Sequence, residues 1–343
     1  MRRLLNVLFV TSQGAYLHRE RESVLVEVDR ETRVRVPVHT LEGIVCFGQV
    51  MVSPQLMELC AERRTTISFL SQNGRFWARV EGPISGNVLL RRAQYRMADN
   101  AESSARIAQA VVIAKLYNSR AVLQRLLRSH PSCQGAEEIE QTISHLGEQL
   151  KALGSPQSVA TVRGIEGEAA RRYFRVFRHL ILAQKDAFPF EERNRRPPLD
   201  NMNALLSFIY TLLVYDVSSA LESVGLDPAV GFLHRDRPGR PGLALDIMEE
   251  FRPYLADRLA LSLVNLKQVT EAGFQKTETG AVNMNEETRR QVIRAYQERK
   301  REEIIHPYLK EKIEVGLIPY AQALLLARYI RGDIDGYPPF MWR

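Results

Sequence analysis

The hydrophobic periodicity of the chain changes once, near residues 82–87. Before that point apolar residues fall in short, partly alternating runs that are typical of β-strands, and after it they recur at helical spacing. A chain of 343 residues also exceeds the size at which a single core usually keeps growing. We therefore expect an α+β protein, with a β-rich domain over residues 1–83 and an all-α domain over residues 84–343.

The β-rich part contains short runs of Val, Leu and Thr separated by turn residues. Strands are expected at Leu5–Val10, Tyr16–Val28 and Thr32–Val38, and their spacing indicates hairpins. Ser53 followed by Pro54 predicts the start of one helix, over Pro54–Arg64. A final hairpin is expected from Thr66–Leu70 through Asn73-Gly74 into Phe76–Val80. Residue by residue, this part favours a purely structural role.

The second part predicts long helices, from near Asn87 to Leu150 with a break at His130-Pro131-Ser132. Another helix is expected to begin around Arg163, after Gly154-Ser155-Pro156, and a further one over Ala204–Val224. The mixed-sign run at residues 299–303 is typical of a solvated helix face.

Charge and cysteine usage narrow the class of protein. Lys and Arg total 47 against 40 for Asp and Glu, which favours a polyanionic partner but does not demand one. The three cysteines have neither disulfide nor zinc-ligand spacing, so a reducing compartment fits. No apolar run approaches the ~20 residues of a membrane span, and we expect a cytoplasmic protein without a membrane partner.

Three segments of the helical part carry ligand-type side chains, and the first two contain Glu166 and His234. Glu166 stands in Arg163-Gly-Ile-Glu-Gly at an expected helix start, where a carboxylate also fits an ordinary capping role. His234 ends Gly231-Phe-Leu-His on an expected loop. A loop histidine is usually solvated, but neutral imidazole is also a metal ligand when carboxylates converge on it.

The third segment holds Asp246 and Glu249, whose spacing would place both carboxylates on one helix face, able to share or support an ion. Glu250 would point about a hundred degrees away. Carboxylates for a cation beside guanidinium groups for phosphates suit a phosphodiester-processing site, although salt-bridged surface helices have the same composition. The basic residues between the first two segments are Arg171, Arg172, Arg175, Arg178, Lys185, Arg193, Arg195 and Arg196.

Four segments follow one another in order: Arg163-Gly-Ile-Glu166-Gly, Arg195-Arg-Pro-Pro-Leu-Asp200-Asn-Met-Asn203-Ala-Leu-Leu-Ser207, Gly225-Leu-Asp-Pro228 with Gly231-Phe-Leu-His234, and Asp246-Ile-Met-Glu249-Glu-Phe-Arg252-Pro253. Together they resemble the CRISPR-associated integrase family, which cuts and joins DNA during spacer acquisition. The tail from Arg331 to Trp342 resembles members from subtype I-C systems, although it also fits simple docking of an aromatic tail onto the body.

The resemblance implies a homodimer, with dimerisation expected through the β domain, and a catalytic divalent cation, Mg²⁺ or Mn²⁺. Its ligands would be Glu166, His234 and Glu249, with Asp246 as a supporting acid. Which of the two acids is the main one stays open, because other branches of the family carry aspartate at the position of Glu249.

The resemblance also implies partners: double-stranded DNA, as spacer precursor and repeat array, and a small ferredoxin-like adaptation subunit that bridges two dimers. DNA contacts would come from Arg163, Arg196, Asn203 and Arg252, although Asn203 equally fits a helix cap.

The implied reaction, a step of antiviral adaptation, is transesterification, in which a 3′ hydroxyl attacks a phosphodiester. Attack by water in place of the hydroxyl would give hydrolysis. Two alternatives remain at this point: a metal-dependent repair or junction nuclease, and a non-catalytic DNA-binding scaffold.

Overall fold

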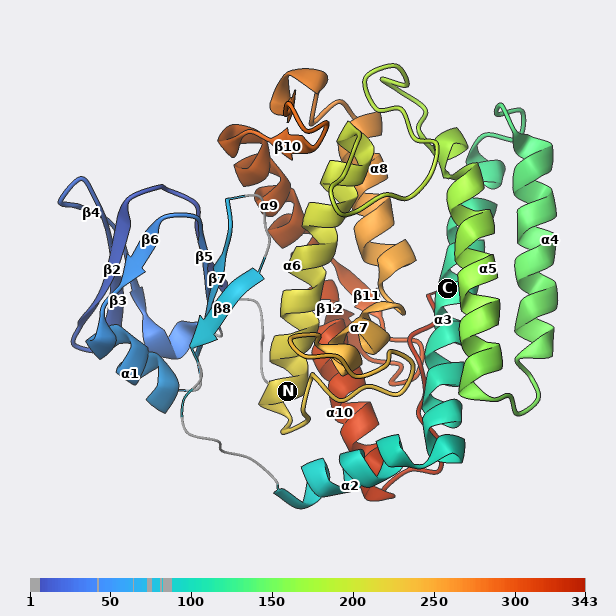
Figure 1. Ribbon diagram of the computed structural model, residues 1–343, viewed down its shortest axis with the longest axis horizontal. Helices are drawn as coiled ribbons and strands as arrows, with labels where there is room; N and C mark the ends of the chain where they lie inside the picture. The colour runs from blue at the N-terminus through green and yellow to red at the C-terminus, as the bar shows by residue number, and fades with distance from the viewer. Residues whose placement is uncertain are drawn as a thin grey trace. The chain divides into compact units, whose positions relative to one another are not determined.

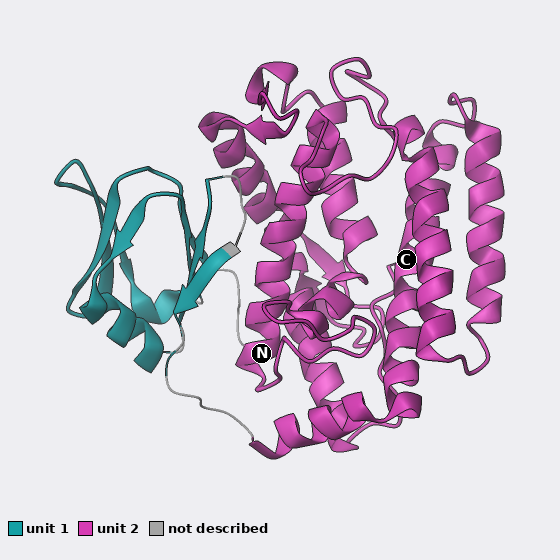
Figure 2. Ribbon diagram, viewed as in Figure 1, with its two compact units in different colours: residues 1–86 teal, residues 87–343 magenta. Residues whose placement is uncertain are grey.

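The computed structural model describes residues 7–41, 43–63, 65–72, 76–80, 82 and 88–342. The chain separates into two compact units, residues 1–86 and residues 87–343 (Figure 2). Strands dominate the first unit and helices the second (Figure 1), as the α+β expectation required.

Over its described residues, the first unit contains two four-stranded sheets, ordered β4-β3-β2-β6 and β1-β5-β7-β8, and one α-helix. Leu17, Ile44, Leu56 and Ile67 are fully buried in its core. The elements are β1 Val7–Val10, β2 Ala15–Glu20, β3 Ser23–Val28, β4 Glu31–Pro37, a 3₁₀ turn Val38–Thr40, β5 Gly43–Phe47, β6 Val50–Val52, α1 Pro54–Glu62, β7 Thr66–Leu70 and β8 Phe76–Val80.

Two predictions for this unit are confirmed, the start of α1 and the hairpins of β2, β3 and β4. Ser53 caps α1, its hydroxyl accepting from the Leu56 amide at 3.2 Å. β2, β3 and β4 form antiparallel hairpins. The expectation of hairpins was wrong for β1, which pairs in parallel with β5 in the other sheet, because that pairing joins segments far apart in sequence. The expected turn at Asn73-Gly74 lies outside the described residues.

The second unit is mainly helical, with two short two-stranded sheets that the all-α expectation missed. Its elements are α2 Val88–Asp99, α3 Ala101–Ser129, α4 Ala136–Ala152, α5 Val159–Phe177, a 3₁₀ turn Arg178–Leu180, α6 Asn201–Ser223, α7 Gly242–Met248, the π-helical turn η3 Arg252–Asp257, α8 Arg258–Asn265, a 3₁₀ turn Glu271–Gly273, β9 Phe274–Lys276, β10 Val282–Met284, α9 Glu286–Arg301, β11 Glu303–Ile305, β12 Lys312–Glu314, a 3₁₀ turn Val315–Leu317 and α10 Ile318–Arg331.

The 29-residue helix α3 organises this unit. It packs against α4 and α5, which stand beside it in Figure 1, and against α2, α7 and η3. The apolar helix α6 packs against α7, α8, α10 and η3. By length and composition α6 could cross a membrane, but 61% of its apolar window is buried inside the structure.

Two helix starts differ from the sequence expectation. α5 begins at Val159, where the Ser158 hydroxyl accepts from the Thr161 amide at 3.1 Å, so Glu166 lies two turns inside the helix and caps nothing. Asp200 caps α6 and accepts from the Asn203 amide at 2.7 Å, so Asn203 is not the cap. In both cases a better hydroxyl or carboxylate acceptor stands upstream.

The run at residues 299–303 is not wholly a solvated face. Lys300 is 2% exposed, and its ammonium lies 2.9 Å from the Asp216 carboxylate. The three cysteines are free thiols in the structure.

Candidate metal centre

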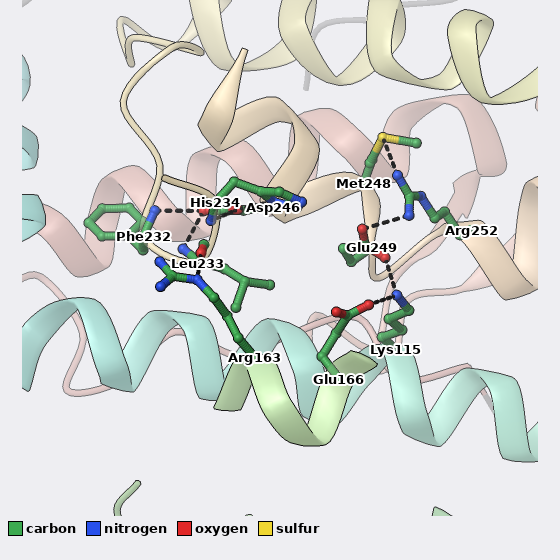
Figure 3. A network of polar contacts seen from close by, with 10 residues as sticks. All are labelled: Lys115, Arg163, Glu166, Phe232, Leu233, His234, Asp246, Met248, Glu249 and Arg252. Carbon is green, nitrogen blue, oxygen red and sulfur yellow. Dashed lines mark hydrogen bonds and ion pairs between the residues drawn. The ribbon is translucent and has the colours of Figure 1, made fainter. Parts of the chain in front are cut away.

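Two carboxylates from different helices converge on one buried ammonium (Figure 3). Glu166 projects from α5, Glu249 follows the end of α7, and Lys115 comes from α3. The Lys115 ammonium contacts Glu166 Oε1 and lies 2.7 Å from Glu249 Oε2. Lys115 is 7% exposed and Glu249 2%. Buried charges are tolerated only when they are paired, so each of the three groups depends on the others.

The charges of this cluster support one another. Burial alone would raise the pKa of Glu249, but the charges of Arg252 and Lys115 outweigh it and lower that pKa. Burial would likewise lower the pKa of Lys115, and the charges of Glu249 and Glu166 raise it. Glu249 is therefore an anion and Lys115 a cation at neutral pH.

His234 is held by Asp246 on the other side of the cluster (Figure 3). Asp246 is fully buried, and its Oδ1 accepts from His234 Nδ1 at 2.6 Å and from the His234 amide at 2.9 Å. Its Oδ2 accepts from the amides of Phe232 and Leu233, at 2.6 and 2.9 Å. Because Nδ1 donates to a carboxylate, Nε2 of a neutral ring keeps its lone pair, as in metal-binding carboxylate–histidine pairs.

The turn that delivers His234 depends on two glycines. A Cβ on Gly231 would lie 2.7 Å from the Gly242 carbonyl carbon and 2.8 Å from Asp246 Oδ2. A Cβ on Gly242 would lie 2.6 Å from the Ala229 carbonyl oxygen. The motif Gly231-Phe-Leu-His234 therefore begins with glycine because the backbone packs directly on α7.

Asp246 and Glu249 have different partners in the structure. Asp246 is committed to the loop that carries His234, whereas Glu249 faces Lys115 and Arg252, with its Oε1 2.7 Å from Arg252 Nη1. The two carboxylates part because α7 ends at Met248, between them.

The implied divalent cation would be held by Glu166, His234 and Glu249. Among the described residues, no group of three His, Cys, Asp or Glu side chains is close enough to hold a metal ion. Glu166 and Glu249 nevertheless already share one cation, and Glu249 Oε2 is buried without a hydrogen bond of good geometry. Carboxylate oxygens and an imidazole nitrogen suit Mg²⁺ or Mn²⁺, so the donor set fits such an ion in its chemistry.

Glu250 points away from this cluster, as expected, and binds the C-terminal tail. It is fully buried and accepts from the Tyr337 hydroxyl at 2.7 Å and the Phe340 amide at 2.7 Å. Gln322 on α10 donates to it at 3.1 Å. Burial raises the pKa of Glu250 to about 8, although these hydrogen bonds oppose the shift.

Asn118, one turn after Lys115 on α3, joins the tail to the same segment. Its amide donates to the carbonyls of Glu250 and Phe340, at 2.7 and 2.8 Å, and its oxygen accepts from the Trp342 amide at 2.7 Å. The tail is thus bound to the backbone directly after Glu249.

Arg252 contacts a buried polar network. The Arg252 guanidinium stacks on Tyr210, 4.9 Å from the centre of its ring. The buried Asp257 accepts from Tyr210 at 2.6 Å and from Tyr173 at 3.0 Å. Burial raises the pKa of Asp257 to about 6. A cavity of about 20 Å³, lined in part by Lys115 and these residues, has room for one water molecule.

The residues expected to contact DNA lie in different settings. Arg163 Nε donates to the Leu233 carbonyl at 2.5 Å and so braces the His234 turn. Arg196 is exposed. Asn203 is fully buried, and its amide binds Arg193 at 2.6 Å and the Glu192 carbonyl at 2.8 Å. As placed, Asn203 fixes the loop that carries Arg196 and presents no free surface.

Comparison with known proteins places the chain in a family. The family described as CRISPR associated protein Cas1 matches residues 8–298. A CRISPR-associated endonuclease Cas1 of Chlorobaculum tepidum is 54% identical over 343 residues, which is 100% of both chains. The chain belongs to the Cas1 family. A second Cas1 endonuclease, of Rhodospirillum rubrum, is 50% identical over 347 residues, again with 100% of both chains covered.

Solved structures agree with the Cas1 fold. A CAS1 protein from Thermotoga maritima superposes with a TM-score of 0.81 at 25% identity, covering 95% of this chain and 97% of that one. A casposase bound to integration product gives 0.84 at 22% identity, covering 98% and 94%. At that identity, the casposase likeness shows the fold alone.

Sequence reasoning missed the two α3 residues at the centre of this Cas1 site. Lys115 interrupts the otherwise apolar run from Val111 to Leu116, and Asn118 follows on the same helix. A single charge on an apolar helical stripe needs a buried partner, which is the signal that points to Lys115. Nothing in the sequence identifies the partner of Asn118, since it is the tail more than 200 residues away.

Proposed function

We propose that this protein is the metal-dependent DNA endonuclease and integrase of CRISPR adaptation, which inserts spacer DNA into a repeat array. The observation that carries the proposal is the convergence of Glu166 and Glu249, from separate helices, on one buried cation. The Cas1 family match supports it, because relatives at 54% and 50% identity are named endonucleases.

The proposed ligands of Mg²⁺ or Mn²⁺ are Glu166, His234 and Glu249, with Asp246 as the support of His234. Glu249 takes the place of the second acid because Asp246 is occupied by four hydrogen bonds from residues 232–234. When bound, a divalent cation supplies charge stabilisation for a phosphorane-like transition state and makes an attacking oxygen more nucleophilic.

In the proposed reaction, a 3′-hydroxyl oxygen of the spacer forms a bond to a repeat phosphorus, and the bridging bond of that phosphodiester breaks. The attacking hydroxyl loses its proton, and the displaced strand leaves with a new 3′ hydroxyl. Asp246 orients the His234 ring, while Arg163 holds the backbone of the turn. Attack by water in place of the hydroxyl gives cleavage.

Two helical glycines support an approach of DNA to this face. Gly164 and Gly167 lie inside α5 on either side of Glu166, both exposed, and a Cβ on either would meet nothing within 4 Å. Glycine inside a helix costs about 1 kcal/mol relative to alanine, and packing does not require it at these positions. An unobstructed backbone beside Glu166 suits close contact with phosphates.

The proposed partners follow the family: double-stranded DNA, a second copy of the chain paired through the β unit, and a small ferredoxin-like subunit. A solved Cas6-RT-Cas1–Cas2 complex that is similar in structure to this chain supports such an assembly. Free thiols fit action in the cytoplasm. The subtype I-C assignment of the tail stays a prediction.

The decisive test is a joining assay with labelled spacer DNA on a supercoiled plasmid that carries the repeat. Glu166→Gln and His234→Ala should lose cleavage and joining but keep DNA binding, while Glu168→Gln, an exposed control on the same helix, keeps all three. Cleavage without labelled joined product would favour a repair or junction nuclease. DNA binding by the parent protein without any cleavage or joining would favour a non-catalytic scaffold.

A further inference from the structure

Lys115 is placed at the centre of the site, and the proposed reaction gives it no task. Its ammonium contacts Glu166 and lies 2.7 Å from Glu249, the two proposed acidic ligands (Figure 3). The lysine is on α3, whereas its partners come from α5 and from the end of α7. Its position therefore results from the packing of three segments.

Electrostatics explains why a cation is needed there before any metal arrives. Two neighbouring carboxylates repel each other, and a cation placed between them offsets this repulsion. A buried ammonium without anions is equally unfavourable. Lys115 therefore neutralises the site in the metal-free protein.

We propose that Lys115 is a tethered counter-cation that competes with the divalent ion for Glu166 and Glu249. The inference rests on the proposed metal site and deepens it. The same oxygens cannot be fully used by both cations, so binding of the ion displaces the ammonium. The measured affinity for the ion then includes the free energy of breaking these ion pairs.

The structure offers the displaced ammonium a second anion. Lys115 lines the cavity of about 20 Å³ together with Tyr173, Tyr210, Arg252 and Asp257. The Asp257 carboxylate accepts hydrogen bonds there from the hydroxyls of Tyr210 and Tyr173. We infer that the ammonium turns toward this cavity and is stabilised by Asp257.

The test is titration of the full-length protein with Mn²⁺ alone, followed by calorimetry. Lys115→Met and Lys115→Gln should bind Mn²⁺ at least about tenfold more tightly than the parent, because the competitor is gone. Lys300→Met is the matched control. It breaks another buried lysine pair, with Asp216 at 2.9 Å, and should lower stability without changing Mn²⁺ affinity.

Equal or weaker binding by both Lys115 variants would overturn the inference. If the variants fold only when Mn²⁺ is present, the ion replaces the ammonium and the inference is supported. If they stay unfolded with Mn²⁺, Lys115 is needed in the loaded state too, and the inference is wrong. A parent protein that does not bind Mn²⁺, or a Glu166→Gln variant that binds it as the parent does, removes the proposed metal site itself and is a separate result.

A double-mutant cycle tests whether the displaced Lys115 ammonium is stabilised by Asp257. Asp257→Asn should weaken Mn²⁺ binding when Lys115 is present and leave it unchanged in Lys115→Met, because only the displaced ammonium uses Asp257. An effect of the same size in both backgrounds would exclude Asp257 as the acceptor.

Discussion

Asp246 accepts a hydrogen bond from His234 Nδ1 at 2.6 Å and also binds the amides of the turn that carries this histidine. Asp246→Asn replaces an acceptor oxygen by a donor facing N–H groups. We expect DNA cleavage to fall roughly 10–100-fold, the usual effect of losing the partner of a metal-binding histidine. Cleavage kinetics at saturating Mn²⁺ measure this, with the exposed Asp236→Asn as control. Cleavage equal to that of the parent would remove Asp246 from the site.

Gly164 and Gly167 can be tested against a glycine elsewhere. Gly147 lies inside α4, where a Cβ would make an ordinary contact with Arg120 at 3.7 Å. Alanine at any of the three should stabilise the protein by up to about 1 kcal/mol. Gly147→Ala should keep its activity, whereas the two α5 variants should lose up to about 10²-fold if the methyl shifts DNA by about 1 Å. Thermal melts and cleavage rates separate the two effects, and unchanged cleavage by both α5 variants would count against DNA contact here.

Arg252 forms an ion pair with Oε1 of Glu249, whereas Lys115 pairs with Oε2. Arg252→Met leaves Glu249 with one cation, and we expect a loss of about 3–5 kcal/mol of unfolding free energy, as when one partner of a buried ion pair is removed. Arg171→Met breaks the exposed pair with Glu168 and should cost less than about 1 kcal/mol. Urea unfolding compares them. Equal small losses would mean that Glu249 does not depend on Arg252.

The raised pKa values of two buried acids predict how the free energy of unfolding changes with pH. Folding raises the pKa of Glu250 from 4.5 to about 8, mainly through burial, and that of Asp257 from 3.8 to about 6. A raised pKa means that the folded state holds the proton more tightly, so this stabilisation is complete below pH ~4 and is lost as the pH rises through each folded pKa.

Unfolding free energy should therefore fall between about pH 4 and about pH 8, by at most about 1.4 kcal/mol per pH unit for each group. Glu250→Gln should flatten the fall up to about pH 8, and Asp257→Asn only its part below about pH 6. Urea unfolding across this range is the measurement. A slope unaffected by Glu250→Gln would show that Glu250 is ionised in the folded protein.

Sequence reasoning succeeded where the signal was local. The change of periodicity placed strands before helices, and Ser53 with Pro54 marked α1. The family segments named Glu166 and Glu249, which the structure joins through Lys115. What was missed depends on distant contacts: the parallel β1–β5 pairing, the partner of Lys115, and the binding of the tail by Glu250. Such contacts cannot be predicted from a short window of sequence, because the two partners lie far apart along the chain.

The docking of the tail has a consequence for how the protein is made. Asn118 and Glu250 form hydrogen bonds with Tyr337, Phe340 and Trp342. Until residues 337–342 have been synthesised, the segment next to Glu249 therefore lacks these hydrogen-bond partners. A truncation before Tyr337 would remove the same partners, although it lies far from Glu250 along the chain.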